Sequence, residues 1–323
     1  MKKWWCRWLQ AVLTMLIVNL PPAGLAWDGH DVITEYALAG LTGLEQFTNI
    51  EITPYTYADV DPSLYNPEFE LEYKLGALGD KVSALDILIT YAPEPDWDLD
   101  ERLELSSLQK LTGGSSGWRH QRYTLAGGLI SLGEAPQRAQ HFYDLALLAY
   151  DQADFYWAFR FLARSLHYLQ DLSQPLHALP LPLSDLAFKY KFAIGRVESV
   201  ASNVHYSIEE YFKYHLVAGD ERLRQALHRS EAAVFTSVEK FATQENKRAR
   251  QKVNGLYHRV LKIWPELDSA EEKRIPSTDF QRTEPAETLT ELWELIEERL
   301  VATGVNTRGL VIKFLSEISP PDN

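Results

Sequence analysis

Apolar side chains recur every three or four positions in two long stretches near the middle of the chain. The first stretch runs from about 136 to 150 and the second from about 155 to 172. This spacing places the apolar side chains on one face of a helix. A short polar break separates the two stretches, and Asp154 is well placed to cap the second helix at its amino end. We therefore predict two consecutive helices.

The same periodicity predicts further helices elsewhere in the chain. They cover residues 28–41, 205–216, 222–236 and 287–302. Runs of alternating polar and apolar residues, the signature of strands, are few. The pattern therefore predicts an all-α fold, a multi-helix bundle.

Three stretches rich in proline or glycine interrupt the helical pattern. Residues 52–71 and 91–118 are predicted to be loops, on the surface or over a site. Residues 265–287 are predicted to link the bundle to a last helix. No shift in composition and no fixed repeat divides the chain, so we expect residues 27–323 to form a single domain.

The first 26 residues have the form of a secretory signal peptide. Lys2, Lys3 and Arg7 provide a basic start, and Leu9 to Leu20 form an apolar run that is short for a membrane span. Small residues follow, and we predict cleavage after Ala26 and export to the periplasm or the medium. An uncleaved membrane anchor is the alternative. No later stretch has the length and apolar character of a membrane span.

Cleavage would change both the cysteine content and the charge of the chain. The only cysteine, Cys6, would be lost, so the mature protein would rely on its core or on bound metal for stability. The full chain has a net charge of −13, and the removed segment holds three basic residues and no acidic one, which leaves −16. This charge opposes nonspecific binding of nucleic acid and strong attraction to anionic lipid surfaces.

Candidate metal ligands occur as histidine and carboxylate pairs at helical spacing. His167 and Asp171 are four residues apart, as are His205 and Glu209, and His177 follows the first pair closely. Residues four apart share one helix face, and nitrogen and carboxylate ligands without thiolate favour zinc in an open catalytic site. A single such pair is more often a solvated polar pair. His167 lies among apolar neighbours, where it is either a ligand or a hydrogen-bonded core histidine.

The run from Phe161 to His177 resembles the signature of the bacterial zinc-dependent phospholipases C. That family has the pattern H-x-x-x-D-x-x-x-x-x-H, usually with Gln-Pro before the last histidine, and the spacing here fits without a gap. The stretch from His205 to Glu209 resembles the family's later H-x-x-x-E pair. Trp27 resembles its mature amino-terminal tryptophan, and His30 the histidine soon after, at a shorter spacing than usual. The resemblance spans most of residues 27–216, which implies a catalytic core there, followed by further helices to the carboxyl end.

The resemblance implies up to three zinc ions, held by nitrogen and oxygen ligands. The first position would use His167, Asp171, His120 and an upstream aspartate; the second His177, His205 and Glu209; the third the Trp27 amine and carbonyl, His30 and a bridging Asp171. Asp96 is the favoured upstream aspartate, and Asp59 and Asp80 are the alternatives. Asp96 would also orient or deprotonate the attacking water. The other histidines, treated as surface or core residues, are His141, His215, His228 and His258.

The resemblance implies hydrolysis of phosphate esters in phospholipids at a membrane surface. Zinc would polarise the phosphoryl oxygens and lower the pKa of a bound water. A single-strand-type zinc nuclease is the alternative, but those enzymes typically have aspartate where this chain has Glu209. A non-catalytic, metal-stabilised helical binding protein is the second alternative. The residues expected either to form a cation-binding wall or simply to pack are Tyr55, Tyr57, Trp97 and Trp118; residues 60–116 are expected to act as a lid or a lipid-facing loop.

Overall fold

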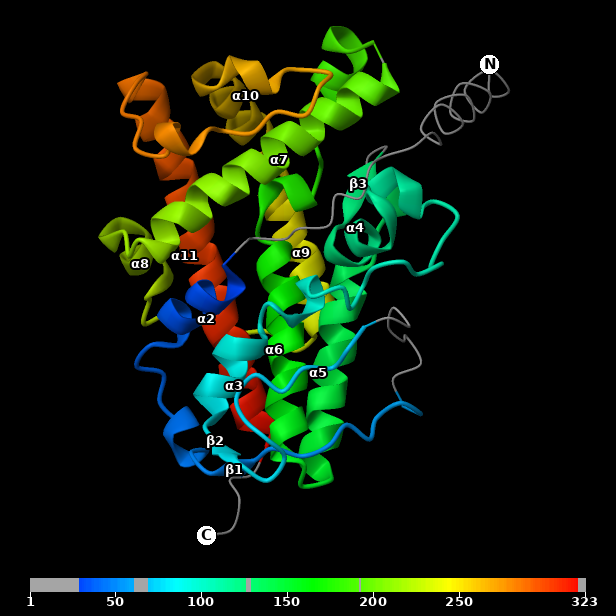
Figure 1. Cartoon of the computed structure of the whole chain (residues 1–323), viewed down its shortest axis with the longest axis vertical. Coiled ribbons are helices and arrows are strands. Elements are labelled where there is room, and N and C mark those ends of the chain that lie inside the picture. The colour runs from blue at the N-terminus through cyan, green and yellow to red at the C-terminus, as the bar shows by residue number, and fades with distance from the viewer. Residues whose placement is uncertain (1–28, 61–68, 126–128, 192, 319–323) are drawn as a thin grey trace.

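The computed structural model describes residues 29–60, 69–125, 129–191 and 193–318. Helices dominate these residues, which confirms the all-α prediction (Figure 1). The α-helices are α2 (His30–Leu38), α3 (Ala84–Tyr91), α4 (Gly114–His120), α5 (Ala135–Asp151), α6 (Phe155–Asp171), α7 (Ile194–Val217), α8 (Glu221–Leu227), α9 (Val238–Arg250), α10 (Val253–Ile263) and α11 (Ala286–Glu317).

Strands are confined to two short antiparallel pairs within the described residues. β1 (Ile50–Glu51) pairs with β2 (Lys81–Val82), and β3 (Tyr123–Leu125) pairs with β4 (Ile130–Leu132). Among these residues, no helix combines the length and the apolar character that crossing a membrane requires.

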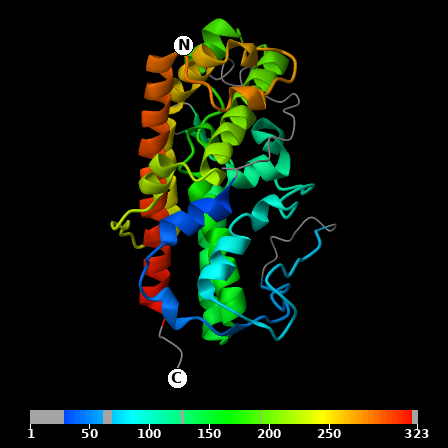
Figure 2. The same ribbon diagram turned by 60° about the vertical axis from the view of Figure 1, so that its left-hand side comes forward.

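The antiparallel helices α5 and α6 form the centre of the molecule. α3, α9 and α11 contact this pair, and α11 runs along the length of the molecule beside it (Figures 1 and 2). One apolar core lies around α5 and α6, and a second lies where α7 and α10 meet α11. Every side chain of α6 from Tyr156 to Asp171 is buried. The polar side chains of this helix therefore need partners inside the protein.

Two sequence predictions are corrected by the structure. Residues 222–236 were expected to be one helix, but α8 ends at Leu227. The chain then follows α11, where the Ala233 amide donates to the Val305 carbonyl at 3.0 Å. Residues 91–118 were expected to be a loop, yet their last five residues, Gly114 to Trp118, belong to α4. Tertiary contacts decide the structure in both places, where local propensity is weak.

Candidate metal centre

A line of polar side chains along α6 organises the site. Arg160, Arg164, His167 and Asp171 follow one another at spacings of four, three and four residues, which places them on one face of the helix. All four are fully buried. The segment 92–100 lies against this polar face, and the contacts described next fix its position.

Glu94 holds this segment on α6. Its carboxylate accepts hydrogen bonds from Arg160 Nε at 3.1 Å and from Arg164 Nε at 2.7 Å, and Arg160 Nη2 also donates to it. Burial by itself would raise the pKa of Glu94, but the two guanidinium groups outweigh that effect and hold its pKa at about 2. Glu94 is therefore an ionised, buried anchor two residues before Asp96.

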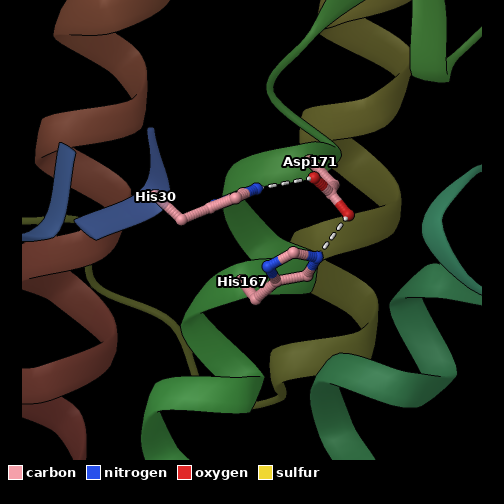
Figure 3. A group of neighbouring side chains, drawn as sticks. All are labelled: His30, His167 and Asp171. Atoms are coloured by element: carbon pink, nitrogen blue, oxygen red, sulfur yellow. Dashed lines mark ion pairs between the residues drawn. The ribbon is translucent and has the colours of Figure 1, made fainter. Parts of the chain in front are cut away.

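Asp171 lies between three histidine rings that come from three different parts of the chain. Its Oδ1 is 3.3 Å from His30 Nε2 (Figure 3). Its Oδ2 is 3.4 Å from His167 Nε2 and 3.0 Å from His120 Nδ1. The two oxygens therefore face different histidines, as in a carboxylate that bridges two cations. We call His30, His167 and Asp171 the Asp171 cluster.

Asp96 completes a neighbouring group that shares His167. Its Oδ1 is 3.6 Å from both His120 Nδ1 and His167 Nε2, and its Oδ2 is 4.0 Å from His30 Nε2. We call Asp96, His120 and His167 the Asp96 cluster. The side chain of Asp96 is 14% exposed, whereas that of Asp171 is fully buried. Asp96 is thus the carboxylate of this group that solvent reaches.

The alternative aspartates lie elsewhere. Asp59 and Asp80 are both exposed, and the Asp80 carboxylate accepts a hydrogen bond from the Ala77 amide at 2.8 Å. Neither belongs to a group of potential metal ligands among the described residues. The geometry therefore favours Asp96 as the upstream aspartate.

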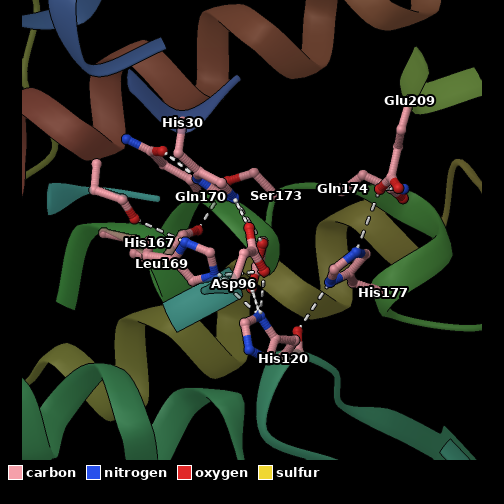
Figure 4. Close-up of polar contacts among 12 residues, drawn as sticks. His30, Asp96, His120, His167, Leu169, Gln170, Ser173, Gln174, His177 and Glu209 are labelled. Carbon is pink, nitrogen blue, oxygen red and sulfur yellow. Dashed lines mark hydrogen bonds and ion pairs between the residues drawn. The ribbon is translucent and has the colours of Figure 1, made fainter. Parts of the chain in front are cut away.

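A third group forms where the turn after α6 meets α7. His177 Nε2 is 3.2 Å from His205 Nε2 and 3.5 Å from Glu209 Oε1, and His205 Nε2 is 3.0 Å from the same oxygen. We call these three residues the Glu209 cluster. Gln174 Nε2 donates to Glu209 Oε1 at 2.9 Å and so helps to orient the carboxylate (Figure 4). The clusters thus unite ligands far apart in sequence.

Hydrogen bonds on the outer side of the rings define their tautomers. His167 Nδ1 donates to the Ala92 carbonyl at 2.8 Å, and His177 Nδ1 donates to the His120 carbonyl at 2.9 Å. A neutral imidazole carries one proton, so Nε2 of each ring presents a lone pair to its cluster. This is the orientation in which metal-binding histidines are usually held.

His30 is oriented in the same way by a glutamine. Gln170 Nε2 donates to the hydroxyls of Thr34 and Thr307, at 3.0 and 3.2 Å, which leaves Oε1 as the acceptor. His30 Nδ1 donates to that oxygen at 2.7 Å. The lone pair of His30 Nε2 is therefore directed toward Asp171.

Burial and neighbouring charges shift the pKa of several groups in the site. Burial lowers the pKa of His120, but the hydrogen bonds that its ring donates to the Asp100 and Asp171 carboxylates outweigh this effect and raise it to about 10. Burial and the neighbouring His30 hold the pKa of His167 well below its usual value. Burial raises the pKa of Glu209 to about 8. Closely packed groups with opposed shifts are typical of functional sites.

The donor atoms fit zinc. They are imidazole nitrogens and carboxylate oxygens, and in each cluster the donor atoms lie within 4.8 Å of one another. Glu209 Oε2 is buried and has no hydrogen-bond partner among the described residues. A buried carboxylate oxygen without a donor is costly, and a bound cation would remove that cost. The third expected position also includes Trp27, which lies outside the described residues.

Three polar residues at the site were not singled out in the sequence. Asp100 contacts the far side of His120, Gln170 orients His30, and Gln174 orients Glu209. Gln170 and Gln174 flank Asp171 in sequence, and their amides are buried in α6 and the turn after it. Uncharged polar residues beside a candidate ligand on a buried helix are the signal that would have identified these two.

The four aromatic residues considered for cation binding contact other side chains of the protein. Tyr57 donates to Asp154 at 2.9 Å, and Tyr55 packs edge-on against a tryptophan ring. The ammonium group of Lys74 lies 3.1 Å from the ring centroid of Trp97. Trp118 packs against a small apolar cluster around β3 and β4. These contacts favour the packing alternative for Tyr55, Tyr57 and Trp118, whereas the Trp97 ring contacts a cation of the protein itself.

A narrow pocket borders the Glu209 cluster at His205. It has a volume of about 50 Å³ and is lined by apolar side chains, together with Glu198, Ser202 and His205. Glu198, Ser202, His205 and Glu209 follow one another on α7 at spacings of four, three and four residues, so they share one face of the helix. The pocket therefore opens on the face of α7 that carries the candidate ligands.

The comparisons with known proteins give a fold-level likeness to two solved structures. No protein family and no curated protein matches the chain. The alpha toxin of Clostridium absonum is 14% identical with a TM-score of 0.45, and the match covers 95% of this chain and 68% of the toxin. A Clostridium perfringens alpha-toxin from an avian strain is also 14% identical, with a TM-score of 0.38 and coverage of 95% and 67%. At these TM-scores the likeness supports no functional conclusion.

Proposed function

We propose that this protein is a zinc-dependent hydrolase of phosphodiester bonds in phospholipids, of the phospholipase C type. The observation that carries the proposal is the clustering of buried histidines and carboxylates, with ring nitrogens directed at carboxylate oxygens within 4.8 Å. The phospholipid as substrate is supported by the sequence resemblance and by the acidic charge, which opposes binding of nucleic acid.

The ligand sets follow from the three clusters. The Asp96 and Asp171 clusters would share His167, and Asp171 would bridge two ions through its separate oxygens. The Glu209 cluster would hold a further ion. Zinc bound there would supply Lewis-acid activation of the phosphate and of a water molecule. The amino-terminal amine and carbonyl of Trp27, exposed by signal cleavage, would complete the Asp171 cluster.

Asp96 is the residue we assign to the proton transfer. It is the partly exposed carboxylate beside His120 and His167, so a water molecule can approach it from solvent. A carboxylate in this place would accept a proton from the attacking water and hold that water toward the phosphate. The buried carboxylates lack this access to solvent.

The test is made on the exported, mature chain. Bound zinc would be measured by elemental analysis, and hydrolysis of phosphatidylcholine vesicles and of single-stranded DNA would be followed with and without a chelator. We expect two or three zinc ions per chain and chelator-sensitive release of diacylglycerol. Cleavage of DNA alone would instead identify a nuclease, and metal with no hydrolysis would identify a binding protein.

A matched pair of histidine variants distinguishes the loss of a metal ligand from the general effect of replacing a histidine. His177→Ala removes a ligand of the Glu209 cluster, whereas His228→Ala changes an exposed histidine outside the clusters. We expect His177→Ala to lose one zinc ion and at least about 100-fold in rate, because a catalytic metal contributes several kcal/mol. His228→Ala should keep its zinc content and its rate of hydrolysis unchanged. Equal behaviour of the two variants would refute the assignment.

A further inference from the structure

Asp100 lies on the far side of His120 from the metal clusters. Its Oδ2 is 3.1 Å from His120 Nε2, while His120 Nδ1 faces Asp171 at 3.0 Å on the other side of the ring. Both Asp100 and His120 are 1% exposed. The ring is therefore held between two carboxylates, one inside the Asp171 cluster and one outside all three clusters.

Three further donors fix the Asp100 carboxylate. Arg119 Nη1 donates to Oδ1 at 2.6 Å, and Arg138 Nη2 is 3.5 Å from the same oxygen. The Tyr168 hydroxyl donates to Oδ2. Two guanidinium groups in a buried site favour the ionised carboxylate, and an ionised carboxylate only accepts hydrogen bonds. His120 Nε2 must then be the donor in its contact with Asp100.

We propose that Asp100 is a positioning residue that directs the Nδ1 lone pair of His120 toward the metal of the Asp96 cluster. The inference rests on the metal-binding part of the proposed function. A histidine binds a metal as the neutral imidazole, and with Nε2 donating to Asp100 the lone pair of that form is on Nδ1, which faces Asp96 at 3.6 Å and His167 Nε2 at 2.9 Å. Carboxylate partners of this kind fix ring orientation and raise the basicity of the ligand.

His120 differs in this respect from the other histidines with a defined outer partner. His167 and His177 donate to backbone carbonyls, and His30 donates to an amide oxygen. His120 donates to a charged side chain, and a carboxylate is a stronger acceptor than a carbonyl or amide oxygen. The structure therefore assigns the strongest outer-sphere control to the ligand from α4.

Asp100→Asn is the isosteric test. The remaining oxygen of Asn would face Arg119 and Arg138, and its amide would then direct N–H groups at His120 Nε2 and at the Tyr168 hydroxyl. The alternative orientation places the amide against the two guanidinium groups. The first arrangement removes the acceptor for His120 Nε2, and the second sets donor against donor at the arginines and leaves His120 Nε2 a neutral, weaker acceptor. We expect zinc affinity at the Asp96 cluster to fall about 10- to 100-fold.

Zinc alone is the probe, titrated into the mature chain in competition with a chromophoric chelator. One site should weaken in Asp100→Asn while the Glu209 cluster keeps its affinity, which also shows that the variant is folded. Asp100→Glu keeps the charge opposite the arginines and displaces the carboxylate from His120, and it should weaken the same site. Tyr168→Phe removes another donor to Asp100 and should keep zinc affinity within about threefold.

Nitrogen NMR of the zinc-loaded wild-type protein gives a second readout. It should show His120 protonated on Nε2. Zinc affinity unchanged within threefold in Asp100→Asn, or a His120 protonated on Nδ1, would overturn the inference while leaving the hydrolase proposal standing. Zinc bound without phosphodiester hydrolysis would overturn the hydrolase proposal, but weaker zinc binding in Asp100→Asn would still support the role of Asp100. A wild-type chain that binds no zinc would overturn both.

Discussion

The buried ion pairs of Glu94 connect the stability of the fold to the position of Asp96. Glu94 contacts Arg160 and Arg164, and all three side chains are fully buried. The change Glu94→Gln keeps the shape of the side chain and removes its charge. Two guanidinium groups would then lie close together without that carboxylate. Removing one partner of a buried ion pair typically costs about 3–5 kcal/mol of folding free energy.

The loss can be measured by urea unfolding followed by circular dichroism, with a chelator present so that metal binding does not contribute. One kcal/mol shifts the Tm of a domain of about 150–250 residues by about 2–4 °C, so we also expect Tm to fall by at least about 5 °C. The matched control is Glu297→Gln, which breaks a half-exposed ion pair with Arg222 and should cost no more than about 1 kcal/mol.

The same variant should affect the metal clusters unequally. Glu94 lies two residues before Asp96 in one turn, so its release should lower zinc affinity at the Asp96 cluster. The ligands of the Glu209 cluster come from the turn after α6 and from α7, so this cluster should keep its zinc. A stability loss below about 1 kcal/mol, or an equal loss of zinc at both clusters, would refute the anchoring role of Glu94.

Three further predictions address metal binding and the long helix. Zinc at 100 times its Kd should stabilise the folded chain by about 2.7 kcal/mol per independent site. Calorimetry should show the corresponding rise in Tm, and a chelator should reverse it. An unchanged Tm would show that zinc does not bind preferentially to the folded chain. Glu209→Gln should remove one zinc ion by elemental analysis, whereas retention of all zinc would exclude Glu209 as a ligand. Gly304→Ala should destabilise the chain by about 1–3 kcal/mol in urea, because its Cβ would lie 2.2 Å from the Leu227 carbonyl oxygen, while Gly195→Ala, with open space around it, should not destabilise it.

The helices that the sequence predicted well are those whose apolar face is decided locally. The stretches near 136–150 and 155–172 match α5 and α6 within about one residue at each end, since their periodicity is strong. α9 was missed because its sequence is mostly polar, and it is held instead by tertiary contacts such as the ion pair between Glu245 and Arg299. The packing of such a helix depends on partners far away in the chain.

The end of α8 shows a different limit. The apolar residues between 228 and 236 form one run, from Ala232 to Phe235, and Val234 is 97% exposed in the structure. Gly309 lets this segment approach the α11 backbone closely at Ala233, and Gly304 does the same for Leu227 at the end of α8. The free energy of that approach depends on two glycines about seventy residues later, which a local pattern does not reveal.

Some candidate ligands could likewise be identified from local sequence spacing, and others could not. His167 with Asp171, and His205 with Glu209, were identified because a helix converts a spacing of four into proximity. Asp96 lies in an irregular segment, so its place depended on the resemblance alone.

The polar line on α6 nevertheless contained the missing information. A helix buried on every side must find partners for its charged residues, and the segment from 94 to 100 carries Glu94, Asp96 and Asp100. The two arginines of α6 need a carboxylate, and Glu94 supplies it. Once Glu94 is placed, Asp96 is two residues away and within reach of His167 on the next turn of α6. The charge requirement of α6 thus points to the segment that carries Asp96.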